Sequence, residues 1–158
     1  MARIVLKFGG TSVGDTDRIK NVASKVKAEV ERGNEVAVVV SAMSGQTNQL
    51  VKWVNEIAPL HDAREYDVVV ATGEQVTIGL LAMALQAEGV KSRSWVSWQI
   101  PIRTDAAHAK ARILDIKTAG IADSMAAGEV PIVPGFQGLA PDGRITTCLL
   151  YTSPSPRD

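Results

Sequence analysis

The chain has 158 residues, of which 46% are hydrophobic, so it is long enough for one domain with a buried core. Basic and acidic residues number 17 each, which leaves no net charge to attract nucleic acid or an acidic membrane surface. The single cysteine, Cys148, excludes an intrachain disulfide, and cysteine and histidine form no metal-ligand cluster. The start lacks a signal peptide pattern, and the longest apolar stretch, residues 78–87, is too short to cross a bilayer. We therefore expect a cytoplasmic protein without a nucleic acid or membrane partner.

The first element is a short apolar segment, residues 3–8, which predicts a strand. Lys7 stands at its end, Gly9 and Gly10 follow, and a helical pattern begins near Asp15. Adjacent glycines let the backbone approach an anion, and the following helix would point N–H groups at the same place. The segment therefore predicts a phosphate-binding turn, although it is not a Walker A motif because the lysine precedes the glycines. A tight turn with a surface lysine is the alternative that Lys-x-Gly-Gly alone leaves open.

A second polar loop follows the second predicted strand. Apolar residues spaced three and four apart predict a helix that ends at Gly33, and the continuous apolar run 36–40 predicts a central parallel strand. This βαβ unit should cross over right-handedly and place Ser41 beside Lys7. Residues 41–48 then form a loop at the same sheet edge, where ligands of open α/β sheets bind. Thr47 or Asn48 is expected to cap the next helix, a role that is compatible with ligand contact.

Further helices and strands complete the pattern. Apolar residues at helical spacing predict a helix after Asn48, and residues 63–73 favour a helix over a strand. A buried helix should run from Glu74 to Gly89, with the Glu74 carboxylate either in a site or complementing the helix dipole. The two histidines, His61 and His108, are interpreted as surface or hydrogen-bonding residues. The remaining expected elements are a strand over 91–98, a loop or edge strand over 100–105, a short strand at 113–114, a helix over 118–127, a strand over 130–133 and a hairpin turning at 141–143.

Four motifs together resemble the successive motifs of aspartate kinase. They are Lys7–Val13, Ser41–Asn48, Thr72–Gln75, and Pro134–Gly138 followed by Ile145–Thr147. The resemblance covers residues 1–147 and implies an α/β fold, the open αβα sandwich of amino acid kinases with a mainly parallel sheet, here truncated. It also implies transfer of the ATP γ-phosphoryl group to the β-carboxylate of L-aspartate. The product, 4-phospho-L-aspartate, leads to lysine, threonine, methionine and diaminopimelate.

The resemblance assigns roles to individual residues. Lys7 would be catalytic, and ATP, carrying Mg²⁺ on its phosphates, would be held by Lys7, Phe8, Gly9 and Gly10. A carboxylate nucleophile is already ionised at neutral pH, so the reaction needs no general base but needs positive groups to offset the repulsion between two anions.

The substrate aspartate would lie against Thr47 and Glu74, with the Glu74 carboxylate paired to the substrate ammonium, and Ser41 would line the same pocket. No residue is expected to bind a metal directly. We expect a homo-oligomer in the full-length protein.

The resemblance stops after Thr147. The family continues there with Leu-Gly-Arg-Gly-Gly-Ser-Asp, whereas residues 148–158 have no periodicity and predict a disordered, non-native tail. The resemblance implies that this chain lacks the rest of the kinase domain and the regulatory ACT domains, so we expect the fragment alone to be inactive. Two alternatives are another carboxylate kinase of this fold, such as N-acetylglutamate kinase, and a non-catalytic nucleotide-binding or dimer-forming module. The Thr11-Ser12 and Gly73-Glu74 pairs argue against the first.

Overall fold

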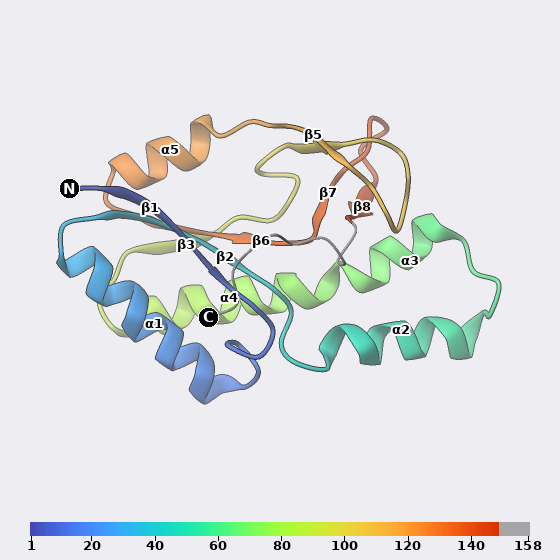
Figure 1. The fold of residues 1–158 in the computed structure, drawn as a ribbon, viewed down its shortest axis with the longest axis horizontal. Helices are drawn as coiled ribbons and strands as arrows, with labels where there is room; N and C mark the ends of the chain where they lie inside the picture. Colours follow the sequence, from blue (N-terminus) through green and yellow to red (C-terminus); the bar gives the residue numbers. More distant parts are fainter. Residues whose placement is uncertain (149–158) are drawn as a thin grey trace.

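A parallel four-stranded sheet lies between helices in the computed structural model, which describes residues 1–148 (Figure 1). Its strand order is β1 (Arg3–Phe8), β2 (Glu35–Val40), β6 (Val130–Pro134) and β3 (Ser92–Ser94), and each neighbouring pair is parallel. The sequence prediction of a βαβ unit at the N-terminus is confirmed. Because Phe8 pairs with Val40, the two strands end at one edge of the sheet, and the Ser41 N–H donates to the Phe8 carbonyl at 3.2 Å.

Helices cover both faces of this sheet. Helices α1 (Thr16–Glu31) and α4 (Thr72–Ala87) pack on one face, and α5 (Ala119–Ala126) lies on the other (Figure 1). The α/β sandwich with a mainly parallel sheet is therefore confirmed. Burying one aliphatic side chain in the core stabilises the folded state by about 2 kcal/mol. The fully buried side chains of the core include Val22, Val26, Val36, Val38, Val40, Ile78, Leu81, Leu85 and Ile132.

A second, mixed sheet contains the strands β5 (Ile113–Ile116), β4 (Ile102–Thr104), β7 (Gln137–Leu139) and β8 (Ile145–Thr147), in this order. The hairpin predicted around residues 141–143 is confirmed as the antiparallel pair β7 and β8. The expectation of a loop or edge strand over residues 100–105 is wrong, because β4 lies between β5 and β7. Pro101 precedes the strand, so it takes no N–H group out of the ladder.

The strand predicted over residues 91–98 is shorter in the structure and ends at Ser94. The side chain of Gln99 accepts the Val96 N–H at 3.0 Å, and the Gln99 N–H donates to the Val96 carbonyl at 2.9 Å. These local bonds take the place of ladder bonds and turn the chain. The prediction failed because the turn depends on a side-chain bond that alternation of apolar residues does not reveal.

Two consecutive helices, α2 (Gln46–Ile57) and α3 (Ala63–Val70), extend beyond the parallel sheet (Figure 1). The helical reading of the segment after residue 62 is confirmed, and the Asp62 carboxylate caps α3 by accepting the Arg64 N–H at 2.8 Å. The prediction that Thr47 or Asn48 caps α2 is wrong, because Gly45 occupies the N-cap position. Gly45 has a φ of 79°, a left-handed conformation that glycine adopts without steric cost.

Helices α3 and α4 follow one another closely. Among the residues that the structure describes, the stretch Ala63–Ala87 is long and apolar enough to cross a membrane by length and composition, and half of its apolar window is buried. Ile78, Leu81 and Leu85 from this stretch belong to the core beneath the parallel sheet. Packing against the sheet therefore accounts for this face of α4, whereas Val76 and Met83 on the same helix are exposed.

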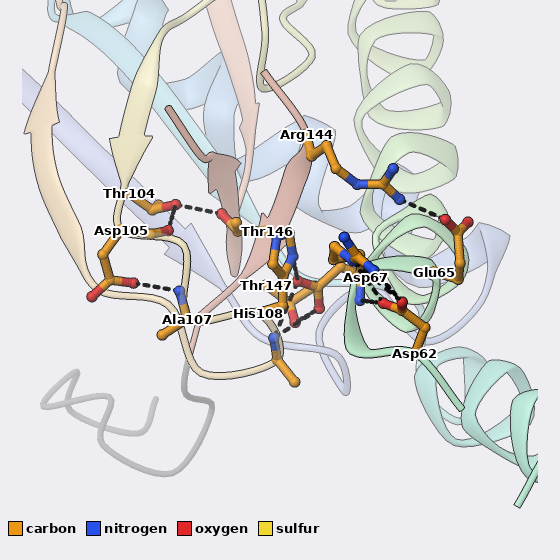
Figure 2. A network of polar contacts seen from close by, with 12 residues as sticks. Asp62, Glu65, Asp67, Thr104, Asp105, Ala107, His108, Arg144, Thr146 and Thr147 are labelled. Carbon is orange, nitrogen blue, oxygen red and sulfur yellow. Dashed lines mark hydrogen bonds and ion pairs between the residues drawn. The ribbon is translucent and has the colours of Figure 1, made fainter. Parts of the chain in front are cut away.

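A buried polar network joins α3 to the second sheet (Figure 2). Asp67 on α3 is completely buried, and its carboxylate oxygens contact His108 Nδ1 at 2.7 Å and accept the Ala109 N–H at 3.1 Å. The Thr147 hydroxyl, on β8, donates to the same carboxylate at 2.6 Å. His108 is thus a hydrogen-bonding residue, as the sequence analysis predicted. His61 also forms a local hydrogen bond, in which Nδ1–H donates to the Ala58 carbonyl oxygen at 3.2 Å.

This network predicts a large loss of stability when its acceptor is removed. We expect Asp67→Ala to lower the free energy of unfolding by about 3 kcal/mol, because it leaves the buried groups of His108, Ala109 and Thr147 without their charged acceptor. Urea denaturation followed by circular dichroism measures the loss. The control is Asp123→Ala on the exposed side of α5, which should change stability by less than about 0.5 kcal/mol. Similar losses from both variants would contradict the structural role of Asp67.

Candidate functional site

A cleft of about 320 Å³ lies at the edge of the parallel sheet where β1 and β2 end. Its lining comes from three of the four motifs: Gly10 and Thr11 after β1, residues 41–45 with Thr47 and Asn48 after β2, and Glu74 from α4. The three residues predicted to contact substrate, Ser41, Thr47 and Glu74, therefore share one cleft with Gly10. Their roles toward a ligand stay predictions.

Two glycines allow these segments to approach one another. A Cβ atom at Gly10 would lie 3.2 Å from the carbonyl oxygen of Ala42, and one at Gly73 would lie 2.8 Å from the Cβ atom of Ala42. Ala42 is buried between them. Because real Cβ atoms do not approach a neighbour as closely as 2.8 Å, α4 can occupy its place only with glycine at position 73.

The predicted phosphate loop lies beside this cleft. Lys7 and Gly9 are exposed, and among the described residues no heavy atom would lie within 4 Å of a Cβ atom at Gly9. The Ser12 N–H donates to the Gly9 carbonyl at 3.0 Å and closes the turn. Lys7 is not part of the cleft lining. The Phe8 side chain is buried in the core, so Phe8 can offer a ligand only its backbone.

The two helices that follow the loops have different N-termini. The Asp15 carboxylate caps α1 by accepting the Arg18 N–H at 2.8 Å, so the expectation that α1 presents its first N–H groups to an anion is wrong for Arg18. In α2, as far as the structure describes it, no side chain caps the first turn, and Gly45, Thr47 and Asn48 line the cleft. The N-terminus of α2 therefore places the positive end of its helix dipole at the cleft.

Glu74 is the buried carboxylate of the cleft, with 2% of its surface exposed. Burial raises the pKa of Glu74 to about 7, while hydrogen bonds from its own backbone N–H and from Gln137 oppose the shift. Gln137 Nε2 donates to Glu74 Oε2 at 3.2 Å and to the Ala71 carbonyl at 3.0 Å. A cationic ligand group beside Glu74 would favour the ionised form. Sequence reasoning placed Gln137 in a motif but missed this contact, because the two residues are 63 positions apart.

An αβα sandwich with a polar cleft at the carboxyl ends of its parallel strands defines a class of proteins that bind ligands at this edge. Residues 2–153 match the model of the amino acid kinase family. Because the match covers nearly the whole chain, the chain belongs to the amino acid kinase family.

The resemblance to aspartate kinase is also confirmed. Over 147 residues the chain is 50% identical to Aspartokinase 2 of Bacillus subtilis (strain 168), a match that covers 93% of this chain and 36% of that protein. The crystal structure of aspartate kinase from Synechocystis superposes with a TM-score of 0.73 at 36% identity, covering 94% of this chain and 24% of the other. E. coli aspartokinase III in complex with aspartate and ADP has the same fold, with a TM-score of 0.76 at 20% identity, covering 93% of this chain and 43% of that one. The chain thus spans about a third of the length of the relative that it matches.

The raised pKa of Glu74 predicts how stability depends on pH. The pKa rises from 4.5 to about 7 on folding, so between these values the folded chain binds more protons than the unfolded chain. Stability should therefore fall as the pH rises through this window, by up to about 1.4 kcal/mol per pH unit.

The variant Glu74→Gln stays neutral and should lack this contribution. Urea denaturation of both proteins from pH 5 to 8 should show the variant gaining about 1 to 3 kcal/mol relative to the unmodified chain. Parallel stability curves over this range would show that the Glu74 pKa is not raised.

Proposed function

We propose that residues 1–147 form the N-terminal part of an aspartate kinase domain, which in a longer protein transfers the γ-phosphoryl group of ATP to the β-carboxylate of L-aspartate. The observation that carries this proposal is the convergence of Ser41, Thr47 and Glu74 on one cleft next to Gly10. The similarity to aspartokinases, and a structural neighbour in complex with aspartate and ADP, support it. The product would be 4-phospho-L-aspartate, the first intermediate toward lysine, threonine and methionine, made in the cytoplasm.

Aspartate carries one ammonium and two carboxylates, and the cleft offers one acid, hydroxyl groups and the N-terminus of α2. The ionised Glu74 carboxylate would pair with the ammonium, and the desolvated surroundings of Glu74 strengthen such a pair. The Thr47 hydroxyl and the N-terminus of α2 would face a carboxylate, with Ser41 beside them. This arrangement favours a free amino group over an acylated amine, because an acylated amine is neutral and would leave a buried acid without a partner.

The nucleotide phosphates would lie over the loop after β1. The open space beside Gly9 admits a phosphate to the backbone, and Lys7, at the end of the strand, supplies positive charge. Phe8 and Gly10 would contribute through their backbone. Within residues 1–148, no three histidine, cysteine, aspartate or glutamate side chains gather as a metal site. The proposal accordingly leaves Mg²⁺ on the nucleotide phosphates.

The transfer is a displacement at phosphorus. A β-carboxylate oxygen of aspartate forms a bond to the γ-phosphorus, the bond from that phosphorus to the β,γ-bridging oxygen breaks, and ADP leaves with the bonding electron pair. An aspartate carboxylate is ionised at neutral pH, so no group needs to remove a proton from it. The role of Lys7 and the backbone N–H groups is to offset the negative charge on the transferring phosphoryl group.

The proposal predicts different kinetic effects for the two charged residues. In the longer enzyme that carries residues 1–147, Lys7→Ala should lower kcat about 100-fold with a smaller change in KM for aspartate, because charge redistributes on the phosphoryl group in the transition state. Glu74→Ala should raise KM for aspartate about 100-fold with a smaller change in kcat. An assay that couples ADP release to NADH oxidation measures both constants. Reversed effects would contradict the assigned roles.

Two further measurements separate the proposal from its alternatives. The 158-residue chain alone should show no aspartate-dependent ADP release in the same assay. The longer enzyme should prefer L-aspartate to N-acetyl-L-glutamate, since Glu74 requires a cation. A preference for the acylated substrate would point to another carboxylate kinase, and nucleotide binding without turnover of either substrate would point to a non-catalytic module.

Size-exclusion chromatography with light scattering of the longer enzyme tests the homo-oligomer that we also propose.

A further inference from the structure

We propose that Gln137 is a positioning residue that holds the Glu74 carboxylate in the cleft, and that the buried Asp67 network fixes the strand pair from which Gln137 projects. The inference rests on the proposed function, because it assigns Gln137 a part in aspartate binding. Gln137 itself is not among the residues that line the cleft, so it acts through Glu74.

The Gln137 side chain is held by two acceptors. It is 5% exposed, and its Nε2 atom, which carries two hydrogens, reaches the Ala71 carbonyl at 3.0 Å and Glu74 Oε2 at 3.2 Å. Ala71 lies at the junction of α3 and α4, and its own N–H donates to the Asp67 carbonyl at 3.0 Å. The amide of Gln137 therefore connects β7 to the helix junction and to the carboxylate at once.

Strand β7 is itself fixed in place on two sides. A Cβ atom at Gly138 would lie 2.7 Å from the Ile102 carbonyl oxygen, so glycine lets β7 lie tightly against β4. On the other side, Gln137 pairs with Thr147 of β8, and the Thr147 hydroxyl donates to Asp67 at 2.6 Å. Asp67 lies on α3, and Ala71 is the C-cap residue at which α3 ends. The contacts therefore form a ring that runs from α3 through β8 and β7 back to the start of α4 (Figure 2 shows the contact between Asp67 and Thr147).

This ring explains how a flexible glutamate can present one fixed orientation. A glutamate side chain has three rotatable torsions and loses their freedom when a ligand immobilises it. With Oε2 already bonded to an amide that is held by Ala71, part of this ordering is complete before substrate arrives. Loss of the amide should therefore weaken aspartate binding, with little effect on the transfer step.

The test is Gln137→Met in the longer enzyme, which keeps an unbranched side chain but removes the donor. We expect KM for aspartate to rise about tenfold with kcat within about twofold. In the Glu74→Ala background, which has no side-chain acceptor for the amide, the same substitution should have no further effect, because Gln137 acts through the Glu74 carboxylate. The matched control is Gln75→Met, an exposed glutamine next to Glu74 on α4, which should leave KM unchanged. Equal effects of Gln137→Met in both backgrounds would overturn the proposal.

A second readout needs no substrate and separates this inference from the proposed function. In the ligand-free 158-residue chain, the side-chain carboxyl carbon of Glu74 can be titrated by NMR. Removing the Gln137 donor should move the Glu74 midpoint to higher pH, because a hydrogen bond to the ionised form is lost. An unchanged midpoint overturns the inference even if aspartate binds, and a shifted midpoint in a protein that fails to use aspartate supports the positioning contact while refuting the proposed substrate.

A third variant keeps the test open if Gln137→Met does not fold. Thr147→Val removes the hydroxyl that donates to Asp67 and leaves the Gln137 side chain unchanged. In the ring of contacts, Thr147 is one step further from the cleft than Gln137. Thermal unfolding first establishes that the variant is folded at the assay temperature. We expect KM for aspartate to rise about threefold, and the rise should vanish in the Glu74→Ala background, which has no side-chain acceptor for Gln137. No change in KM, or the same change in both backgrounds, would contradict the ring of contacts.

Discussion

The candidate site depends on one close approach, that of Gly10 and Gly73 to opposite sides of Ala42. Ala42 lies in the loop after β2, Gly10 in the loop after β1, and Gly73 in the first turn of α4. Missing Cβ atoms let three separate segments meet within van der Waals distance, and this contact places Ser41, Thr47 and Glu74 around one cleft. Such close contacts fix the three segments relative to one another, because tightly packed atoms leave little room for movement.

Burial of Glu74 is the energetic consequence of this packing. The carboxylate loses water and its pKa rises to about 7, so without a ligand it is balanced between its neutral and ionised forms near neutral pH. The Gln137 amide offsets part of this cost and orients the group. An ammonium ligand would offset more, which couples recognition of a free amino acid to the charge of the site. Buried carboxyl groups with raised pKa values are frequent at functional sites.

Local and topological rules predicted much of this arrangement. Apolar spacing identified β1, α1, β2 and α4, and the right-handed βαβ rule placed Ser41 beside the end of β1, where its N–H indeed contacts Phe8. Such rules do not predict hydrogen bonds between side chains that are far apart in the sequence. The helix predicted over residues 63–73 gives no sign that its Asp67 binds Thr147, 80 residues later, and Gln99 ends a strand that the alternation of apolar residues predicted to be longer. A prediction over a short range also failed at Gly45. Its left-handed conformation makes it the N-cap of α2, a position that was predicted for Thr47 or Asn48.

The most direct test of the account compares two glycines of α4. An alanine at position 73 would meet Ala42 at 2.8 Å, whereas a Cβ atom at Gly79 would have no described heavy atom within 4 Å. Gly79→Ala should raise the free energy of unfolding by about 0.5 to 1 kcal/mol, as expected in a helix interior, and leave KM for aspartate in the longer enzyme unchanged. Gly73→Ala should lower the free energy of unfolding by about 1 to 3 kcal/mol and raise KM for aspartate at least tenfold, because the loop after β2 must move. If both variants behave alike in stability and in KM, the contact at Ala42 does not form the site.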